Sequence, residues 1–348
     1  MDPTDAEELL RYVDERPSLL EMPFGYVCAM QRLACTIVGD MPSKPNLTSS
    51  CPDHTWCSIN GYRVSIDQFR GLVKALIRNC TRLMEDEVLM GLDTSWILRE
   101  LEGGTIMDEL NKMHAGYSFA TDERNKFHEH KHDLLNHLFT DGTTSSHFIH
   151  AVDETGKILW KKKSMRCWKA STEKLAERLV VLFHFVLGQP HRSIEYESFL
   201  ILNTGTNERT LYWSDETLVT FQSYNKMCNS SKAKPVKLVC RFLPLCLRQL
   251  YLQYFCIIRP AEVFVAGELW GAVPAALYRD CWFVRWGKWC ATHHFSDIME
   301  SEFFKHCSAS FRVKQYRHLA KFFCEPIRAH RTRQCEKRLW MHLQDTLR

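Results

Sequence analysis

The spacing of apolar residues changes along this chain, and that change limits the folds available to it. Over residues 65–92 the apolar side chains recur at the three- and four-residue intervals of an amphipathic helix, and residues 96–113 continue in the same style. Between residues 149 and 160 the pattern shortens to two apolar stretches around a Glu154-Thr155-Gly156-Lys157 turn, which predicts a β-hairpin. We therefore expect a domain boundary near residue 145.

A second long helix and a small sheet are predicted beyond that boundary. Apolar spacing predicts a helix over residues 171–187, capped by Ser171 or Thr172 and ended by the Gly-Gln-Pro run at 188–190. Three strand-like runs then predict a three-stranded antiparallel sheet, at residues 210–213, 218–223 and 236–242. The remainder, from residue 245, has mainly helical spacing. The expected fold class is therefore α+β and mainly helical, with helices around one small antiparallel sheet.

Three segments make up the expected domain organisation. Residues 1–57 are predicted to form an N-terminal arm, because an opening helix gives way to the breaker cluster Pro42-Ser43-Lys44-Pro45-Asn46. Residues 58–145 are predicted to form a helical domain and residues 146–348 a mixed domain. The length of 348 residues also favours two domains over one or three.

Several classes of protein are excluded by this composition. Residues 1–14 begin with acidic side chains and predict a helix, so we expect no secretory leader. The longest apolar runs, at 179–187 and 255–273, are too short or too broken by charged residues to span a bilayer, so we expect no membrane segment. The fifteen cysteines are scattered and often flanked by apolar residues, which indicates reduced, buried thiols in an intracellular protein.

Charge is divided unevenly along the chain. Residues 1–150 carry 14 Lys and Arg against 23 Asp and Glu, a net charge of −9, whereas the remaining residues carry 31 against 18, a net charge of +13. A basic second part favours a polyanion partner, since neutralised phosphates supply most of the affinity for nucleic acid. The alternative is an unevenly solvated surface. The acidic first part is a poor phosphate clamp, and a protein partner is the alternative there.

Metal-binding and nucleotide-binding motifs are weakly represented. Two sets of residues have zinc-ligand chemistry but lack paired Cys-x-x-Cys spacing, namely Cys51, His54 and Cys57, and Cys281, Cys290, His293 and His294. A third set contains four histidines, His128, His130, His132 and His137. On a predicted helix only His128 and His132 share a face. The chain also lacks a GxxxxGK[ST] loop, a GxGxxG turn after a strand and a GxSxG elbow, so we expect no metal and no cofactor.

One constellation of charged residues carries a specific chemistry. Arg192 follows a helix-ending turn, Glu195 lies three residues on, and an apolar run comes next. Lys226 lies between two predicted strands. Farther along, the run Lys314-Gln315-Tyr316-Arg317-His318 places an arginine before a histidine, and Trp340 stands 23 residues after that arginine.

These positions, in this order, resemble the conserved boxes of tyrosine recombinases. Arg192 with Glu195 is similar to their first arginine box, although the glycine lies farther back than usual. Lys226 is similar to their β-hairpin lysine, and residues 314–318 to their His-x-x-Arg-His box with lysine in the leading position. Trp340 stands where the family has a histidine or tryptophan. The resemblance implies a helical core-binding-like domain at 58–145 and a tyrosine-recombinase-like catalytic domain at 146–348, incomplete at its C-terminus.

A narrower resemblance rests on short motifs. Four stretches are similar to segments of fungal telomere-linked RecQ-type helicase genes and Crypton-like mobile elements: the Gly-Gln-Pro-His-Arg run ending at Arg192, the stretch from Arg209 to Lys226, the Arg241-Phe242-Leu243-Pro244 run and the Tyr316-Arg317-His318 triplet. This similarity covers roughly residues 55 to 330 and is strongest after residue 175; the helicase motor itself is absent. It implies a nuclear protein whose partner is duplex DNA.

The resemblance also implies a role for each residue. Arg192 and Arg317 would hold the non-bridging oxygens of a phosphate, because their planar guanidinium groups each donate two hydrogen bonds. Lys226 would give a proton to the leaving oxygen, and Lys314 would act as a cation or proton acceptor on the attacking side. Trp340 would donate its indole N–H to a phosphate oxygen, and His318 would contact DNA. We expect Arg192, Lys226 and Arg317 to converge on one basic concave surface.

The tyrosine nucleophile of the family has no counterpart in this sequence. Tyr316 is the last tyrosine, and it precedes Arg317 instead of following it. Adjacent helical residues point about 100 degrees apart, so Tyr316 is a poor substitute. We therefore expect a DNA-binding protein that does not cleave DNA, either a truncated gene product or a domain retained for binding. The alternatives are an active recombinase or transposase whose nucleophile comes from another chain, and a protein-interaction scaffold.

Overall fold

A computed structural model describes residues 47–51, 55–188, 190–191, 195–196, 199–222 and 239–329 of the chain. The chain divides into two compact units, residues 1–46 and 47–348, and every described residue belongs to the second unit. Most of the expected N-terminal arm lies outside the described residues, as do Arg192, Lys226 and Trp340.

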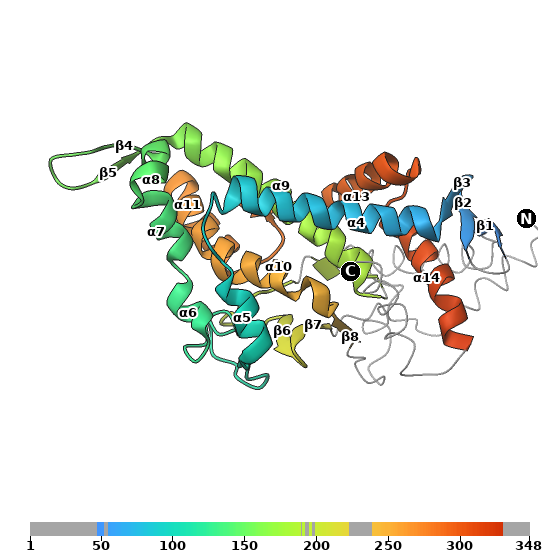
Figure 1. Ribbon diagram of the computed structural model, residues 1–348. Coiled ribbons are helices and arrows are strands. Elements are labelled where there is room, and N and C mark those ends of the chain that lie inside the picture. Colours follow the sequence, from blue (N-terminus) through green and yellow to red (C-terminus); the bar gives the residue numbers. More distant parts are fainter. Residues whose placement is uncertain are drawn as a thin grey trace, which may run out of the picture. The chain divides into compact units, whose positions relative to one another are not determined.

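Helices dominate the described residues, as the sequence predicts (Figure 1). The α-helices are α4 (Ile66–Arg82), α5 (Trp96–Gly103), α6 (Lys126–His130), α7 (Asp133–Phe139), α8 (Gly142–Phe148), α9 (Lys162–Val186), α10 (Arg248–Leu252), α11 (Arg259–Trp270), α12 (Ala272–Asp280), α13 (Thr292–Cys307) and α14 (Val313–Ala329). Two π-helical turns, η1 (Leu83–Val88) and η4 (Gln253–Ile258), and one 3₁₀ turn, η3 (Leu245–Leu247), adjoin them. None of the described helices is both long and apolar enough to cross a bilayer.

The described strands form small antiparallel sheets. They are β1 (Leu47–Ser50), β2 (Trp56–Ile59), β3 (Tyr62–Ser65), β4 (Ile149–Val152), β5 (Ile158–Trp160), β6 (Leu211–Ser214), β7 (Thr217–Gln222), β8 (Val239–Phe242), β9 (Val284–Arg285) and β10 (Lys288–Trp289). The sheets have the orders β1-β2-β3, β4-β5, β6-β7-β8 and β9-β10. The predicted hairpin near residue 155 and the predicted three-stranded sheet are both confirmed, and so is the coarse fold class.

The β2–β3 hairpin is a feature that the helical periodicity of this region did not predict. Its two-residue turn is Asn60-Gly61, with φ of 51° and 84°, and Ile59 pairs with Tyr62 across it. Asparagine and glycine tolerate positive φ better than other residues, so this pair suits a tight hairpin turn. Strands therefore occupy residues 56–65, where the sequence predicted the end of an arm and the start of helices.

Helix α9 begins nine residues before its predicted start. The sequence predicted Ser171 or Thr172 as its cap, but both lie inside the helix. The hydroxyl of Thr172 donates to the carbonyl of Lys169, at 2.9 Å, and the hydroxyl of Ser171 donates to the Glu87 carboxylate, at 2.6 Å. Serine and threonine are tolerated inside a helix when the hydroxyl finds such a partner, so they do not mark the helix start here.

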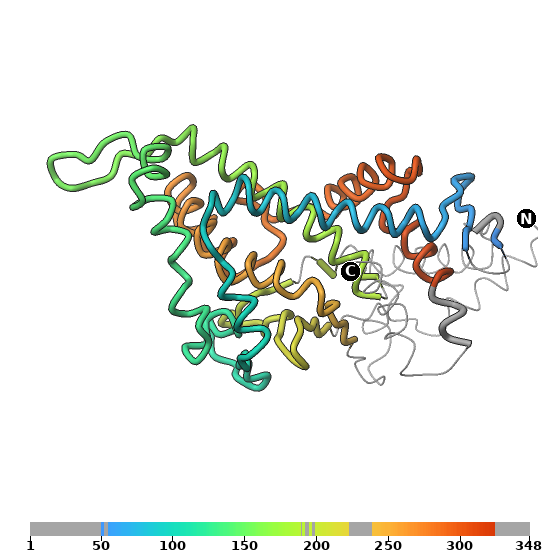
Figure 2. The backbone as a smooth tube through the Cα atoms, viewed as in Figure 1, coloured from blue at the N-terminus to red at the C-terminus, as the bar shows by residue number. Residues whose placement is uncertain are grey.

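A large hydrophobic cluster runs through the second unit, from Cys57 to Phe323, and a smaller one is formed by Ala266, Tyr278, Cys281 and Val284. Helices α4 and α9 lie side by side within the large cluster (Figures 1 and 2), and the Trp168 indole on α9 donates to the carbonyl of Val88, at 3.0 Å. The large cluster includes buried residues on both sides of the expected boundary near residue 145. The division into domains at that position stays a prediction.

A buried ion pair also links the two sides of that boundary. The Arg209 guanidinium lies 2.7 Å from the Asp108 carboxylate, and both side chains are fully buried. The second carboxylate oxygen of Asp108 accepts from the backbone N–H of Trp213, at 2.8 Å. The arginine of the Arg-Thr-Leu-Tyr-Trp run therefore anchors strand β6 to residues 108–112.

Candidate functional site

Helix α14 has a buried apolar face and a basic face. Its buried side chains include Val313, Tyr316, Leu319 and Phe322. Four basic residues follow the i, i+3, i+4, i+7 spacing of one helix face, namely Lys314, Arg317, His318 and Lys321. We call these four residues the α14 basic face. Lys314 and Lys321 are exposed, and Arg317 and His318 are half-buried.

The charges of the α14 basic face act on one another. The pKa of His318 lies below its usual value. Partial burial is the largest cause, and the positive charges of Lys314, Arg317 and Lys321 follow in that order. Within the described part of the chain, no carboxylate forms an ion pair with Lys314, Arg317 or Lys321. The nearby Arg312, by contrast, is paired with Asp297 at 3.0 Å and with Glu300 at 2.7 Å. Among the described residues, the positive charges of Lys314, Arg317 and Lys321 are therefore not paired with a carboxylate.

Tyr316 fixes the orientation of α14. Its hydroxyl donates to the carbonyl of Phe185 near the end of α9, at 3.0 Å. Its ring centroid lies 4.8 Å from that of Phe185 and 5.1 Å from that of His184. Because Tyr316 is only 2% exposed, its hydroxyl belongs to the core and not to the basic face. This position agrees with the expectation that Tyr316 does not act as a nucleophile.

The charge of Arg317 acts on a second arginine, Arg241. Arg241, on strand β8, is 6% exposed, and its guanidinium lies 3.5 Å from the Glu195 carboxylate. Burial lowers the pKa of Arg241, Glu195 opposes that change, and the positive charge of Arg317 adds to it. Gln222 on β7 donates to the backbone carbonyl of Glu195, at 3.0 Å, and so holds this segment against the sheet.

Two histidines are buried beside this pair of arginines. His184 and His191 are both fully buried. The pKa of His184 is lowered to about 3, first by burial and then by the charges of Arg241 and Arg317. The pKa of His191 is lowered well below its usual value, first by burial and then by Arg241 and His184. Both imidazoles are therefore neutral at physiological pH. His184 is hydrogen-bonded to the Tyr196 hydroxyl, whereas neither ring nitrogen of His191 has a hydrogen-bond partner among the described residues.

The segments that flank two of the predicted boxes therefore meet. His191 and Glu195 flank Arg192, and both lie beside Arg241, whose charge interacts with that of Arg317. Arg192, Lys226 and Trp340 themselves lie outside the described residues, so the predicted convergence of Arg192, Lys226 and Arg317 stays a prediction.

Comparison with known proteins gives no further assignment. No family model and no solved structure matches this chain. The resemblance to tyrosine recombinases therefore rests on the sequence motifs alone.

Two basic residues were not singled out by the sequence analysis. The Arg-Phe-Leu-Pro motif contains Arg241 but predicts no role for it, and Lys321 lies outside the motifs. The spacing of Lys321 from Lys314 and Arg317 indicates that the three residues share one helix face. The position of Arg241 depends on how β8 packs, which no local pattern gives.

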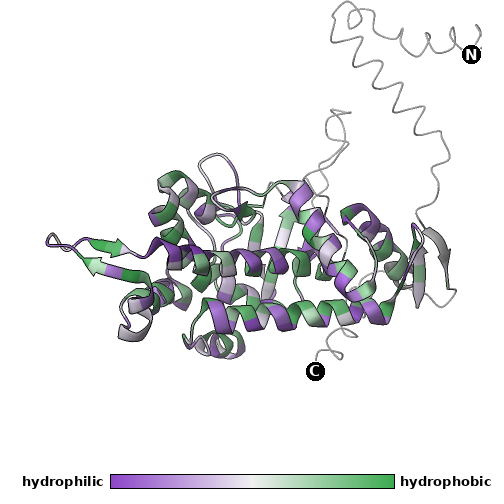
Figure 3. Ribbon diagram, turned by 90° about the horizontal axis from the view of Figure 1, so that it is seen from above, coloured by the Kyte–Doolittle hydropathy of each residue, from purple (hydrophilic) through white to green (hydrophobic). Residues whose placement is uncertain are grey.

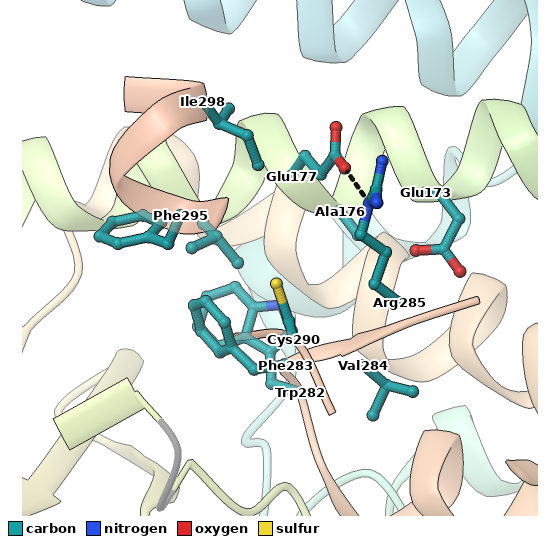
Figure 4. A pocket seen from close by; sticks show the side chains of 11 residues that line it. Glu173, Ala176, Glu177, Trp282, Phe283, Val284, Arg285, Cys290, Phe295 and Ile298 are labelled. Atoms are coloured by element: carbon teal, nitrogen blue, oxygen red, sulfur yellow. Dashed lines mark hydrogen bonds and ion pairs between the residues drawn. The ribbon is translucent and has the colours of Figure 1, made fainter. Parts of the chain in front are cut away.

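A small pocket is lined by side chains of α9, of α13 and of residues 282–290 (Figure 4). Glu173 and Glu177 on α9 line it together with Arg285 and Cys290, and its interior of about 20 Å³ holds roughly one water molecule. Glu177 is already engaged, because it accepts from Arg285 at 2.8 Å and contacts the imidazole of His294 at 3.0 Å. The pocket is too small for an organic substrate. Among the described side chains, no group of three or more His, Cys, Asp and Glu residues is arranged to hold a metal ion.

Proposed function

We propose that this chain binds duplex DNA through its phosphates and that the α14 basic face is a principal contact surface. One observation carries the proposal: four basic residues share one helix face, and three of them lack a carboxylate partner among the described residues. The three are Lys314, Arg317 and Lys321.

Electrostatics explains why such a face favours a polyanion. Like charges at i,i+4 positions destabilise a helix by about 0.2–0.5 kcal/mol per pair. A phosphate backbone turns that cost into a gain, because each neutralised phosphate releases condensed counterions. The buried face of α14 holds the helix in place through Tyr316, so the cations are presented on a fixed support.

The resemblance to tyrosine recombinases adds a proposed geometry. In that family two arginines hold one phosphate, and the proposed pair here is Arg192 and Arg317. The neighbours of Arg192 lie beside Arg241, and Arg241 interacts with Arg317, which supports a common location for both boxes. Neutral His184 and His191 add no charge to this location.

Salt-dependent DNA binding tests the proposal. Fluorescence anisotropy with a labelled duplex should show affinity that falls steeply with salt, and K314A/K321A should reduce the slope of log K against log salt by about 2, one unit per lost phosphate contact. The matched control is R78A/K174A, since Arg78 and Lys174 are also exposed basic residues on helices. An absence of duplex binding at low salt rejects the proposal, and so does an equal loss in both double variants.

A further inference from the structure

The β4–β5 hairpin extends beyond the helices that flank it (Figures 1 and 3). Its turn is well ordered by hydrogen bonds. The Asp153 carboxylate accepts from the backbone N–H groups of Thr155 and Lys157, at 2.9 and 2.8 Å, and Gly156 adopts a φ of +81°. The hairpin is therefore a defined projection that leads directly into the start of α9.

Positive charge gathers where the hairpin meets α9. The exposed basic residues there are Lys161, Lys162, Lys163 and Arg166, which we call the hairpin-base cluster. Lys161 donates to the backbone carbonyl of Ser146, at 2.7 Å. Within the described part of the chain, none of the four forms an ion pair with a carboxylate.

This cluster is electrostatically unfavourable for the protein alone. The N-terminal end of a helix carries partial positive charge and favours acidic side chains. The first turn of α9 has no acidic residue, and Lys161 at the N-cap forms no side-chain cap hydrogen bond. Lysine side chains therefore repel both one another and the helix end. Bound anionic groups would remove that repulsion.

Helix α9 sets the spacing between this cluster and α14. Lys163 lies near its start, and Phe185, which contacts Tyr316 of α14, lies 22 residues later. At 1.5 Å per residue, this separation is roughly 33 Å. Arg166 and His184 are 18 residues apart, which is five full helical turns, so they point in about the same direction from the helix axis. The ring of His184 lies 5.1 Å from that of Tyr316, so Arg166 lies on the side of α9 that contacts α14.

A separation of this size matches the repeat of DNA. One turn of B-DNA spans about 34 Å, so successive phosphates on one face of a duplex recur at that distance. We infer that the hairpin-base cluster is a second phosphate-binding surface and that it contacts the same duplex about one helical turn from the α14 basic face. This inference rests on the proposed DNA-binding function and adds a second contact and its spacing.

Duplex length provides the test. A duplex of about 8 base pairs is shorter than one turn and should contact one surface at a time, whereas a duplex of about 24 base pairs should contact both. We expect the slope of log K against log salt to be steeper for the longer duplex. The variant K162A/K163A/R166A should lose that increment, a change in slope of about 3, and should retain the slope of the short duplex at the α14 basic face.

Two controls separate folding from binding. The same three substitutions remove repulsion at the start of α9, so the melting temperature should stay the same or rise. The R78A/K174A variant should keep the length-dependent increment, because its residues lie outside both surfaces.

The outcomes distinguish the two proposals. If the wild-type protein binds no duplex at low salt, the proposed function fails and this inference with it. If the wild-type protein binds duplex but K162A/K163A/R166A keeps the full slope on the longer duplex, the second surface is refuted while the proposed function stands. Tighter binding to anionic lipid vesicles than to the longer duplex, lost in the same variant, would also refute it.

Discussion

The hydroxyl of Tyr316 donates a hydrogen bond to the carbonyl of Phe185 and so connects α14 to the end of α9. Both residues are buried, and this contact holds the α14 basic face in its position. Removal of the hydroxyl in Y316F leaves a buried carbonyl without this donor, which costs about 1–3 kcal/mol. Urea unfolding should show the loss.

Affinity for duplex DNA should change much less in Y316F than in K314A/K321A, when both are measured at a temperature where they are folded. The reason is that the hydroxyl points into the core and away from the basic residues. A stability equal to that of the wild-type protein would show that the hydrogen bond contributes nothing.

Tyr316 is not expected to form a covalent bond to DNA. Its hydroxyl is buried and engaged with a backbone carbonyl, so it does not reach a phosphate bound at the α14 basic face. A nicked suicide substrate incubated with the protein should leave no adduct on Tyr316, as measured by mass spectrometry of peptides. Detection of a nucleotide on this residue would contradict the placement of Tyr316 and reopen the cleavage question.

Much of the fold could be predicted from local patterns, and the errors have local causes. The β4–β5 and β6–β7 hairpins followed from turn residues between apolar runs. The Asn60-Gly61 pair was an equally strong turn signal, but the helical spacing that begins at residue 65 masked it. Ser171 and Thr172 were mistaken for a cap because residues of that type also occur inside helices when they find partners.

The site was only partly readable in the sequence. Lys314, Arg317 and His318 were singled out, and their common helix face follows from spacing alone. The interaction of Arg241 with Arg317 and Glu195 could not be read, because it joins a strand, a turn and a helix that are far apart in the chain. Local periodicity contains no information about such packing.

The free energy of unfolding should decrease as the pH is lowered below 7, because buried histidines resist protonation. The ordinary pKa of histidine is about 6.5, whereas that of His184 is lowered to about 3, by burial first. Between these pH values His184 is protonated in the unfolded chain but stays neutral in the folded protein. The stabilisation is therefore fully present above pH 6.5 and is lost as the pH falls toward 3, by up to about 1.4 kcal/mol per pH unit for each such histidine.

Urea unfolding at pH 7 and pH 5 measures this dependence. H184Q should reduce it, because glutamine does not titrate and can still contact the Tyr196 hydroxyl. The control is H147Q, since His147 is exposed. Equal pH dependence in the wild-type protein and H184Q would argue that His184 is not neutral in the fold.

The β6–β7 turn contains a residue in an unfavourable backbone conformation. Its two central residues, Asp215 and Glu216, have φ of 50° and 63°, and glycine is favoured at the second position of such a turn. The Glu216 side chain is 81% exposed, and its replacement removes one ion pair, with Arg248 at 3.6 Å, which contributes little at such an exposed site. E216G should stabilise the protein by about 1 kcal/mol in thermal or urea unfolding. G61A, at a φ of +84°, should have the opposite sign, and a destabilised E216G would contradict the argument.

Lys169 lies at the centre of a buried ionic network between α9 and α11. Its ammonium lies 2.8 Å from the Glu173 carboxylate and 2.7 Å from that of Glu262, and Arg259 lies 3.0 Å from the other oxygen of Glu262. All four side chains are buried. Burial raises the pKa of Glu262, but Lys169 and Arg259 outweigh it and bring the pKa to about 2.

Substitution of Lys169 should therefore be costly. K169M removes the cation that Glu173 and Glu262 share and leaves Arg259 paired with Glu262, which should destabilise the fold by about 3–5 kcal/mol. K174M provides the matched control, because Lys174 lies on the same helix but is exposed, and its loss should stay within about 0.5 kcal/mol. The loss in K169M should also shrink at low pH, since Lys169 lowers the pKa of Glu262, and without the lysine this carboxylate takes up a proton more readily. Equal stability of K169M and K174M in urea unfolding at pH 7 would show that the network contributes no net stabilisation.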